Sequence, residues 1–298
     1  MRYVVSLGGN ALGHDAPSQK KALLLVVPLI RRLTDEGHEV VIVHGNGPQV
    51  GMIQNAFASA TPSMPLVECG AMSQGYIGYH LQNVLKSALP NRSIVTLVSQ
   101  MQVDPSDEAF FSPTKPIGPF YTKETANQLA KENTLTFIED SGRGYRQVVA
   151  SPKPTHYVEI DALKTLLNNQ HLVICGGGGG IPVIAREGRL EGVDAVIDKD
   201  FASALIAEQI NADRLIILTA VPYVYLDFNL PTQRALTRVT LQEIENILTH
   251  HAFAKGSMGP KVLAAHQFVS RTQKTAIIGA LEEADALLDE KSGTILTA

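Results

Sequence analysis

The chain has 298 residues, of which 45% are hydrophobic and 18% charged, and its formal net charge is −4. At roughly 150 residues per domain, this length allows two domains or one large α/β domain with a sizeable core. The apolar content excludes a disordered chain, and the near-neutral charge argues against non-specific nucleic-acid binding.

Short runs rich in Val, Ile and Leu alternate along the chain with longer helical patterns. The expected strands, in chain order, are Tyr3–Leu7, Glu39–Val43, Ser93–Val98, Leu135–Ile138, Arg146–Val149, His171–Cys175, Ala195–Ile197, Arg214–Thr219 and Thr275–Ile278. The expected helices are 18–36 (N-cap Ser18, kink at Pro28), 48–58, 68–89, 200–210, 240–250 behind a capping box at Thr240 and Glu243, 260–271 with Pro260 first, and a last one ending at Leu288.

Most of these strands are apolar throughout, which indicates burial on both faces. Alternation of strands and helices then predicts a mainly parallel sheet with helices on both sides. Residues 102–155 depart from this alternation, because they are polar and contain frequent Pro and Gly residues. We expect them to form an inserted subdomain.

Three of the apolar strands run directly into glycine turns. The turns are Gly8-Gly9-Asn10, Gly45-Asn46-Gly47 and Gly176 to Gly180. Parallel strands place such turns at one sheet edge, where bare backbone N–H groups bind anionic oxygens. A lone glycine pair is more often a tight turn, but three such loops favour a ligand site. No GxxxxGK[ST] occurs and no GxGxxG follows a strand, so a P-loop is excluded and a dinucleotide fold is disfavoured.

Three lysines stand in unusual local contexts. Lys115 lies in a Pro-rich turn of the insertion, Lys199 directly follows a buried strand, and Lys261 lies in the first turn of a helix. A lysine at a helix start opposes the helix dipole, which suggests that it meets an anion. Cations of this kind neutralise charge during phosphoryl transfer. Each lysine could also be solvated surface charge. Asp200 could orient two lysines, help to hold Mg²⁺, or cap a helix.

Six segments resemble those of carbamate kinases, in the order in which that family carries them. They are Ser6 to Leu12, His44 to Gly51, Pro113 to Tyr121 (PTKPIGPFY), Cys175 to Val183 (CGGGGGIPV), Gly192 to Asp200 (GVDAVIDKD) and Gly256 to Lys261 (GSMGPK). The resemblance implies the amino acid kinase fold, a three-layer αβα sandwich around a mainly parallel, about eight-stranded sheet. It implies one domain over 1–298, with a lobe at 1–212 bearing a protruding subdomain near 102–155, and a nucleotide-side lobe at 213–298.

The resemblance also implies a reaction and residue roles. The reaction is ATP + carbamate ⇌ ADP + carbamoyl phosphate with Mg²⁺, running towards ATP in catabolism, in a typically homodimeric enzyme. Lys115, Lys199, Asp200 and Lys261 would be catalytic, with no metal bound by protein side chains. Transferring phosphoryl oxygens would meet Gly8, Gly9 and Asn10, whereas Gly45, Asn46, Gly47, Gly176, Gly177 and Gly178 would line the carbamate side. The nucleotide would be bordered by Thr219, Ala220, Val221, Tyr223, Tyr225, Ser257, Met258, Gly259 and Pro260.

Two segments depart from the family pattern and keep alternatives open. The basic segment after Leu12 is shortened to 13–18, and the nucleotide side has Pro222 and Asn229-Leu230-Pro231 where an acidic residue and a Gly-Lys-Pro turn are common. The alternatives are a kinase of the same superfamily for another carboxylate, a divergent carbamate kinase-like protein, and a non-catalytic ligand-binding homologue. His44 resembles a catalytic base, but a structural role is favoured.

The expected compartment follows from the cysteines and from the start of the chain. Cys69 and Cys175 form no CxxC pair, and the first residues do not form a signal peptide. The longest apolar stretch, Ala22 to Ile30, has nine residues, too few to span a bilayer. We therefore expect a cytoplasmic protein without membrane or nucleic-acid partners, acting in arginine metabolism or a related breakdown route.

Overall fold

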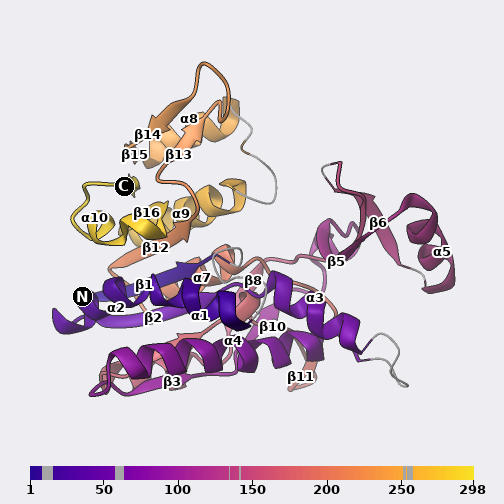
Figure 1. Cartoon of the computed structure of the whole chain (residues 1–298), viewed down its shortest axis with the longest axis horizontal. Helices are drawn as coiled ribbons and strands as arrows, with labels where there is room; N and C mark the ends of the chain where they lie inside the picture. The colour runs from indigo at the N-terminus through magenta and orange to yellow at the C-terminus, as the bar shows by residue number, and fades with distance from the viewer. Residues whose placement is uncertain (9–15, 58–63, 134, 141, 251–252, 254–257) are drawn as a thin grey trace.

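The computed structural model describes residues 1–8, 16–57, 64–133, 135–140, 142–250, 253 and 258–298. Its centre is an eight-stranded sheet (Figure 1). In spatial order the strands are β15 (Arg238–Thr240), β17 (Thr294–Thr297), β16 (Thr275–Ala280), β12 (Arg214–Thr219), β1 (Arg2–Leu7), β2 (Glu39–His44), β9 (Leu172–Cys175) and β3 (Ile94–Thr96). Only the β16–β17 pair is antiparallel among these ladders, so the predicted mainly parallel sheet is confirmed.

Helices cover both faces of this sheet, and each face has its own apolar core. Side chains of α1 (Ala16–Leu24), α2 (Val27–Asp35), α4 (Leu66–Ala88) and α10 (Ala284–Leu288) share one core with the sheet. Side chains of α6 (Ile160–Asn168), α7 (Lys199–Gln209), α8 (Leu241–His250) and α9 (Met258–Thr272) share the other. The fold is therefore the three-layer sandwich that the sequence predicted. None of the described helices is long and apolar enough to cross a membrane.

Smaller sheets are attached to this body. A four-stranded sheet has the order β11 (Arg189–Gly192), β10 (Ile181–Arg186), β4 (Gln100–Val103) and β8 (Pro154–Tyr157), and β13 (Val224–Leu226) pairs with β14 (Arg234–Leu236). Within the insertion, β5 (Lys115–Tyr121), β7 (Tyr145–Val149) and β6 (Thr136–Glu139) form a third sheet, accompanied by α5 (Lys123–Asn133). This unit projects beyond α3 (Gly47–Ala56), away from the main body (Figure 1).

Four predicted features differ from the structure. Lys115, which the sequence placed in a Pro-rich turn, is the first residue of strand β5 and pairs with Val149. The single helix 18–36 is two helices, because Pro28 has no N–H to donate to Leu24 and takes the second position of α2; Ser18 lies inside α1 and is not a cap. Helix α9 begins at Met258, and Pro260 is tolerated in the first turn, where N–H groups lack helical acceptors. At 195–197 only Ala195 forms a bridge, since the chain turns into α7 at Asp198.

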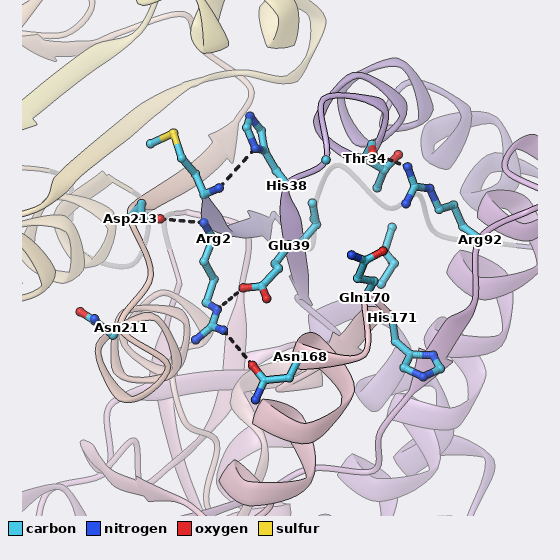
Figure 2. Close-up of a pocket in the computed structure, with 14 residues that line it drawn as sticks. Arg2, Thr34, His38, Glu39, Arg92, Asn168, Gln170, His171, Asn211 and Asp213 are labelled. Atoms are coloured by element: carbon cyan, nitrogen blue, oxygen red, sulfur yellow. Dashed lines mark hydrogen bonds and ion pairs between the residues drawn. The ribbon is translucent and has the colours of Figure 1, made fainter.

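The amino ends of the central strands surround a polar hollow of about 580 Å³, shown in Figure 2. Arg2 crosses it. Its guanidinium bonds the Glu39 carboxylate at 2.6 Å, the Ile210 carbonyl and the Asn168 side chain. Its backbone N–H donates to Asp213 at 2.8 Å. Arg2 therefore ties the ends of α6 and α7 to β1, β2 and β12 on the edge opposite the glycine turns.

At the carboxyl end of β2, His44 is fully buried against Gly177. Its Nδ1 lies 3.0 Å from the Gly45 carbonyl oxygen, and since a carbonyl can only accept, Nδ1 carries a hydrogen and donates it. Burial lowers the pKa of His44 from 6.5 to about 4, and nearby Lys199 adds to that effect. The ring is thus a neutral packing element at neutral pH, consistent with the structural role favoured above.

Arg2→Ala should lower the free energy of unfolding by about 1–2 kcal/mol, because a partly buried, multiply bonded guanidinium is lost. Chemical denaturation at fixed protein concentration measures the change. Arg186→Ala is the control, since its ion pair with Glu191 is 3.7 Å long and largely exposed, and about 0.5 kcal/mol or less is expected. Equal losses in both variants would contradict the role of Arg2.

His44 should make the protein less stable in acid. Its folded pKa is depressed, so its contribution is complete above the unfolded pKa of 6.5 and is lost as pH falls towards about 4. Across that window this one group contributes a slope of about 1.4 kcal/mol per pH unit. Denaturation at several pH values should show a flatter slope for His44→Gln and an unchanged slope for the control His156→Gln, which changes an exposed residue. A wild-type slope in His44→Gln would contradict the assignment.

Candidate active site

The glycine turns lie at one edge of the sheet because the strands before them are in register. Leu7 pairs with both His44 and Leu218, and Val43 pairs with Cys175. The residues that follow these strand ends therefore share the carboxyl edge, where open α/β sheets bind ligands. The sequence prediction of a single glycine-lined edge agrees with this geometry.

A buried carboxylate joins two of the predicted lysines at this edge. Lys199 Nζ lies 2.6 Å from Asp200 Oδ1, and Lys261 Nζ lies 3.0 Å from Asp200 Oδ2. The lysines come from the first turns of α7 and α9, which pack against each other. Ser6 of β1 accepts a hydrogen bond from Lys199 at 2.8 Å and lies 3.3 Å from Asp200 Oδ1. Three elements distant in sequence thus converge on one carboxylate.

The two ammonium groups keep the Asp200 carboxylate ionised. Burial by itself would raise the pKa of Asp200, whose side chain is 3% exposed, but the two ammonium groups outweigh burial and hold that pKa below its usual value. Burial lowers the pKa of Lys199, and Asp200 opposes the shift. With both lysines protonated, the three groups carry one net positive charge, which suits an anionic ligand.

The inserted subdomain contributes Lys115 to the same place. Its Nζ lies 2.8 Å from Asp198 Oδ2, whereas Asp198 Oδ1 accepts the Asp200 N–H at 3.0 Å and caps α7. The N-cap role that the sequence suggested for Asp200 is therefore filled by Asp198. One carboxylate links the subdomain to the helix that carries Lys199.

The five-glycine loop permits a very close approach of backbone and side chains. Gly178 has φ +66°, and a Cβ there would lie 2.1 Å from Asn46 Nδ2. Gly179 has φ +95°, and a Cβ would lie 2.2 Å from the Ile197 carbonyl oxygen. Any other residue would push apart the walls on which the site is built.

These groups surround a cleft of about 480 Å³. Of the predicted site residues, it is lined by Gly8, Gly45, Asn46, Gly47, Lys115, Gly178, Lys199, Asp200, Thr219, Ala220 and Lys261. Predicted residues that the structure describes but does not place on this lining are Gly176, Gly177, Val221, Tyr223, Tyr225, Met258, Gly259 and Pro260. Gly9, Asn10 and Ser257 lie outside the described residues.

Sequence reasoning missed two residues of the site. Ser6 is a hydroxyl within an otherwise apolar buried strand, and that was the signal available. Arg146 lines the cleft from β7, where it bonds the Gly118 carbonyl at 3.1 Å and Asp140 at 3.2 Å. The neighbouring sequence did not indicate that Arg146 lines the cleft, because this depends on where the inserted subdomain lies relative to the main sheet.

The described residues contain no group of three or more His, Cys, Asp or Glu that could hold a metal ion. Two of the carboxylates that line the cleft, Asp198 and Asp200, are each paired with lysine. These donors fit Mg²⁺ poorly by themselves, so Mg²⁺ would have to arrive coordinated by phosphate oxygens and water.

Comparison with known proteins agrees with these observations. The family model described as the amino acid kinase family matches residues 1–279. The chain is 48% identical to a carbamate kinase of Staphylococcus haemolyticus, over 99% of both chains. It is also 48% identical to the carbamate kinase-like protein YqeA of Escherichia coli, over 99% of this chain and 98% of that one.

Among solved structures, carbamate kinase from Giardia lamblia bound to AMP-PNP superposes with a TM-score of 0.91 at 43% identity, covering 99% of this chain and 98% of that one. Similarity of sequence and of fold therefore extends over nearly the full length, and the resemblance of the six segments is confirmed. The chain belongs to the amino acid kinase family, and within it to the group of the carbamate kinases.

Proposed function

We propose that the protein catalyses reversible phosphoryl transfer between ATP and carbamate, ADP + carbamoyl phosphate ⇌ ATP + carbamate. The observation that carries this proposal is the Lys199–Asp200–Lys261 cluster, which stands at the glycine edge and faces Lys115 across the cleft. ATP as the nucleotide is supported by the Giardia lamblia relative, whose structure holds AMP-PNP.

The chain's own groups suffice for the transfer. Carbamate already has an anionic oxygen that can attack phosphorus, so no strong base is required, and neutral His44 is not one. Lysine ammonium groups lie where they would stabilise the negative charge that is spread over the equatorial oxygens of the transferring phosphoryl group. Asp200 holds Lys199 and Lys261 at fixed positions, so little reorganisation is needed during transfer.

Mg²⁺ would enter with the nucleotide and neutralise charge on its phosphates. Asp198 and Asp200 are already paired with lysines, so the residues that orient the ion would act through the phosphates it binds. The glycine loops and the lysines would therefore fix the metal–nucleotide complex by its oxygens.

A divergent substrate is the second candidate, and one comparison favours it. The relative YqeA is named carbamate kinase-like rather than carbamate kinase. The departures at Pro222 and 229–231 surround the β13–β14 pair, and none of these residues lines the cleft. Changes at these positions would alter nucleotide contacts rather than the groups that carry out phosphoryl transfer.

The remaining expectations are proposals of the same kind. We infer a homodimer in the cytoplasm, taking carbamoyl phosphate from the breakdown of arginine or of a related compound. Size-exclusion chromatography with light scattering tests the dimer directly.

Purified protein mixed with carbamoyl phosphate, ADP and Mg²⁺ should form ATP at a rate that rises linearly with enzyme concentration. A luciferase assay measures the ATP. Reactions without enzyme, and with Mg²⁺ chelated, are the controls and should give background signal. No ATP at high enzyme concentration would refute the proposal; acetylglutamate, aspartate and UMP would then be tested as phosphoryl acceptors.

Lys261→Ala should lower kcat about 100- to 1000-fold, because one preorganised cation next to the transferring group is lost. The fold should be retained, as thermal unfolding can verify. Lys274→Ala is the matched control: Lys274 also pairs with an aspartate, Asp213 at 3.4 Å, but more than a third of its side chain is exposed, and turnover should stay near wild type. Turnover above a tenth of wild type in Lys261→Ala would contradict its role.

A further inference from the structure

The amide of Asn46 has an orientation that the hydrogen-bond network fixes. Asn46 Nδ2 lies 2.8 Å from Ser73 Oγ, and Ser73 Oγ lies 2.6 Å from the Gly70 carbonyl oxygen. A hydroxyl has one hydrogen, and the carbonyl can only accept it. Ser73 must therefore accept from Asn46, so the NH₂ end of the amide faces α4 and Oδ1 faces the other way.

Asn46 also does not cap the helix that follows it, although it stands at the capping position. It is the N-cap residue of α3, where asparagine is favoured because its oxygen bonds free helix N–H groups, yet it makes no capping bond. Its side chain instead lies flat on Gly178, where a Cβ would come within 2.1–2.6 Å of its amide atoms. Ser73 is fully buried, so both sides of the amide are fixed by packing.

The freed oxygen is open to the cleft. Asn46 lines the cleft and is 8% exposed. Its Oδ1 has no hydrogen-bond partner among the described residues and is not fully buried. Of the residues on this wall, Gly45, Asn46, Gly47, Pro48, Val50 and Gly178, only Asn46 has a polar side chain. The wall therefore presents one fixed side-chain acceptor.

The charged groups of the cleft do not provide a free hydrogen-bond acceptor on the Asn46 side. Lys115, Lys199 and Lys261 are donors, and they suit anionic oxygens. The acceptors Asp198 and Asp200 already bind these lysines. Thr219 and Glu282 lie on the β12–β16 side of the sheet, across β1 from Asn46.

Resting on the proposed function, we propose that Asn46 Oδ1 accepts a hydrogen bond from the amino group of carbamate or carbamoyl phosphate. That amino group has two N–H donors, whereas the methyl group of acetate or acetyl phosphate has none. Asn46 is then a specificity-determining residue, and Ser73 is the positioning residue that holds its oxygen towards the substrate. A site built to bond a substrate N–H discriminates against an analogue that lacks it.

The test compares carbamoyl phosphate with acetyl phosphate as phosphoryl donors to ADP, as a ratio of kcat/KM values. Wild type should prefer carbamoyl phosphate by about 10-fold or more. The ratio should fall about 5- to 20-fold in Asn46→Ala and in Ser73→Ala, and the double variant should fall no further than Asn46→Ala. Ser87→Ala is the matched control, because that hydroxyl also bonds a carbonyl of α4 but is exposed and does not bond Asn46; its ratio should match wild type.

A merely structural role would lower kcat/KM for both donors together and leave the ratio unchanged, and that result would overturn the proposal. Binding is measured separately, as the thermal stabilisation produced by each donor without ADP. If wild type makes ATP from neither donor, the proposed function fails. A larger stabilisation by carbamoyl phosphate that Asn46→Ala removes would still support the recognition, and equal stabilisation by both donors would refute it.

Discussion

The whole site depends on one buried carboxylate that is shared by two ammonium groups. Asp200 is almost completely removed from water, so leaving it unpaired would cost several kcal/mol. Pairing with Lys199 and Lys261 requires α7 and α9 to present their first turns to each other. The hydroxyl of Ser6 in the core strand β1 completes the network. Lysines that would be unfavourable at helix starts are thereby stabilised where an anion is also needed.

The second constraint is the close approach of the two loops on the other side of the site. The chain at 176–180 packs so tightly on His44, Asn46 and Ile197 that side chains are excluded. Neighbouring residues of α4 hold each loop: Ser73 bonds Asn46, and Gln74 bonds Ser99 and the Gly177 carbonyl at 3.1 Å. Because α4 holds both loops, packing fixes the wall of the cleft that they form, and a small substrate would meet this wall already in place.

Local sequence patterns predicted the elements whose signals are local. The capping box forms as expected, with Thr240 N–H donating to Glu243 at 2.8 Å. Buried strands such as β2 and β12 agree with their apolar runs to within a residue. Prediction failed where long-range pairing decides. The β10–β11 hairpin, the edge strand β15 and its neighbour β17 were missed, because residues such as Arg189–Gly192 form a strand only against a partner. Tyr223 and Tyr225, which we expect to border the nucleotide, pack edge-on against each other with ring centroids 6.2 Å apart, and their nucleotide role stays a prediction.

The sequence by itself determined the order of the main apolar strands and their helices, the positions of the glycine turns and the identity of the lysines, because these follow from periodicity, turn chemistry and residue type. Only the tertiary structure decided that Asp198 rather than Asp200 caps α7, that Ser6 bonds the Lys199–Asp200 pair, that Arg146 lines the cleft, and that Ser73 fixes the Asn46 amide. Ser6 and Lys199 are 193 residues apart and Asn46 and Ser73 are 27 apart. The cap depends on which of two nearby carboxylates the helix end meets. Which groups bond each other depends on which ones the fold brings together in space, and local sequence patterns do not show this.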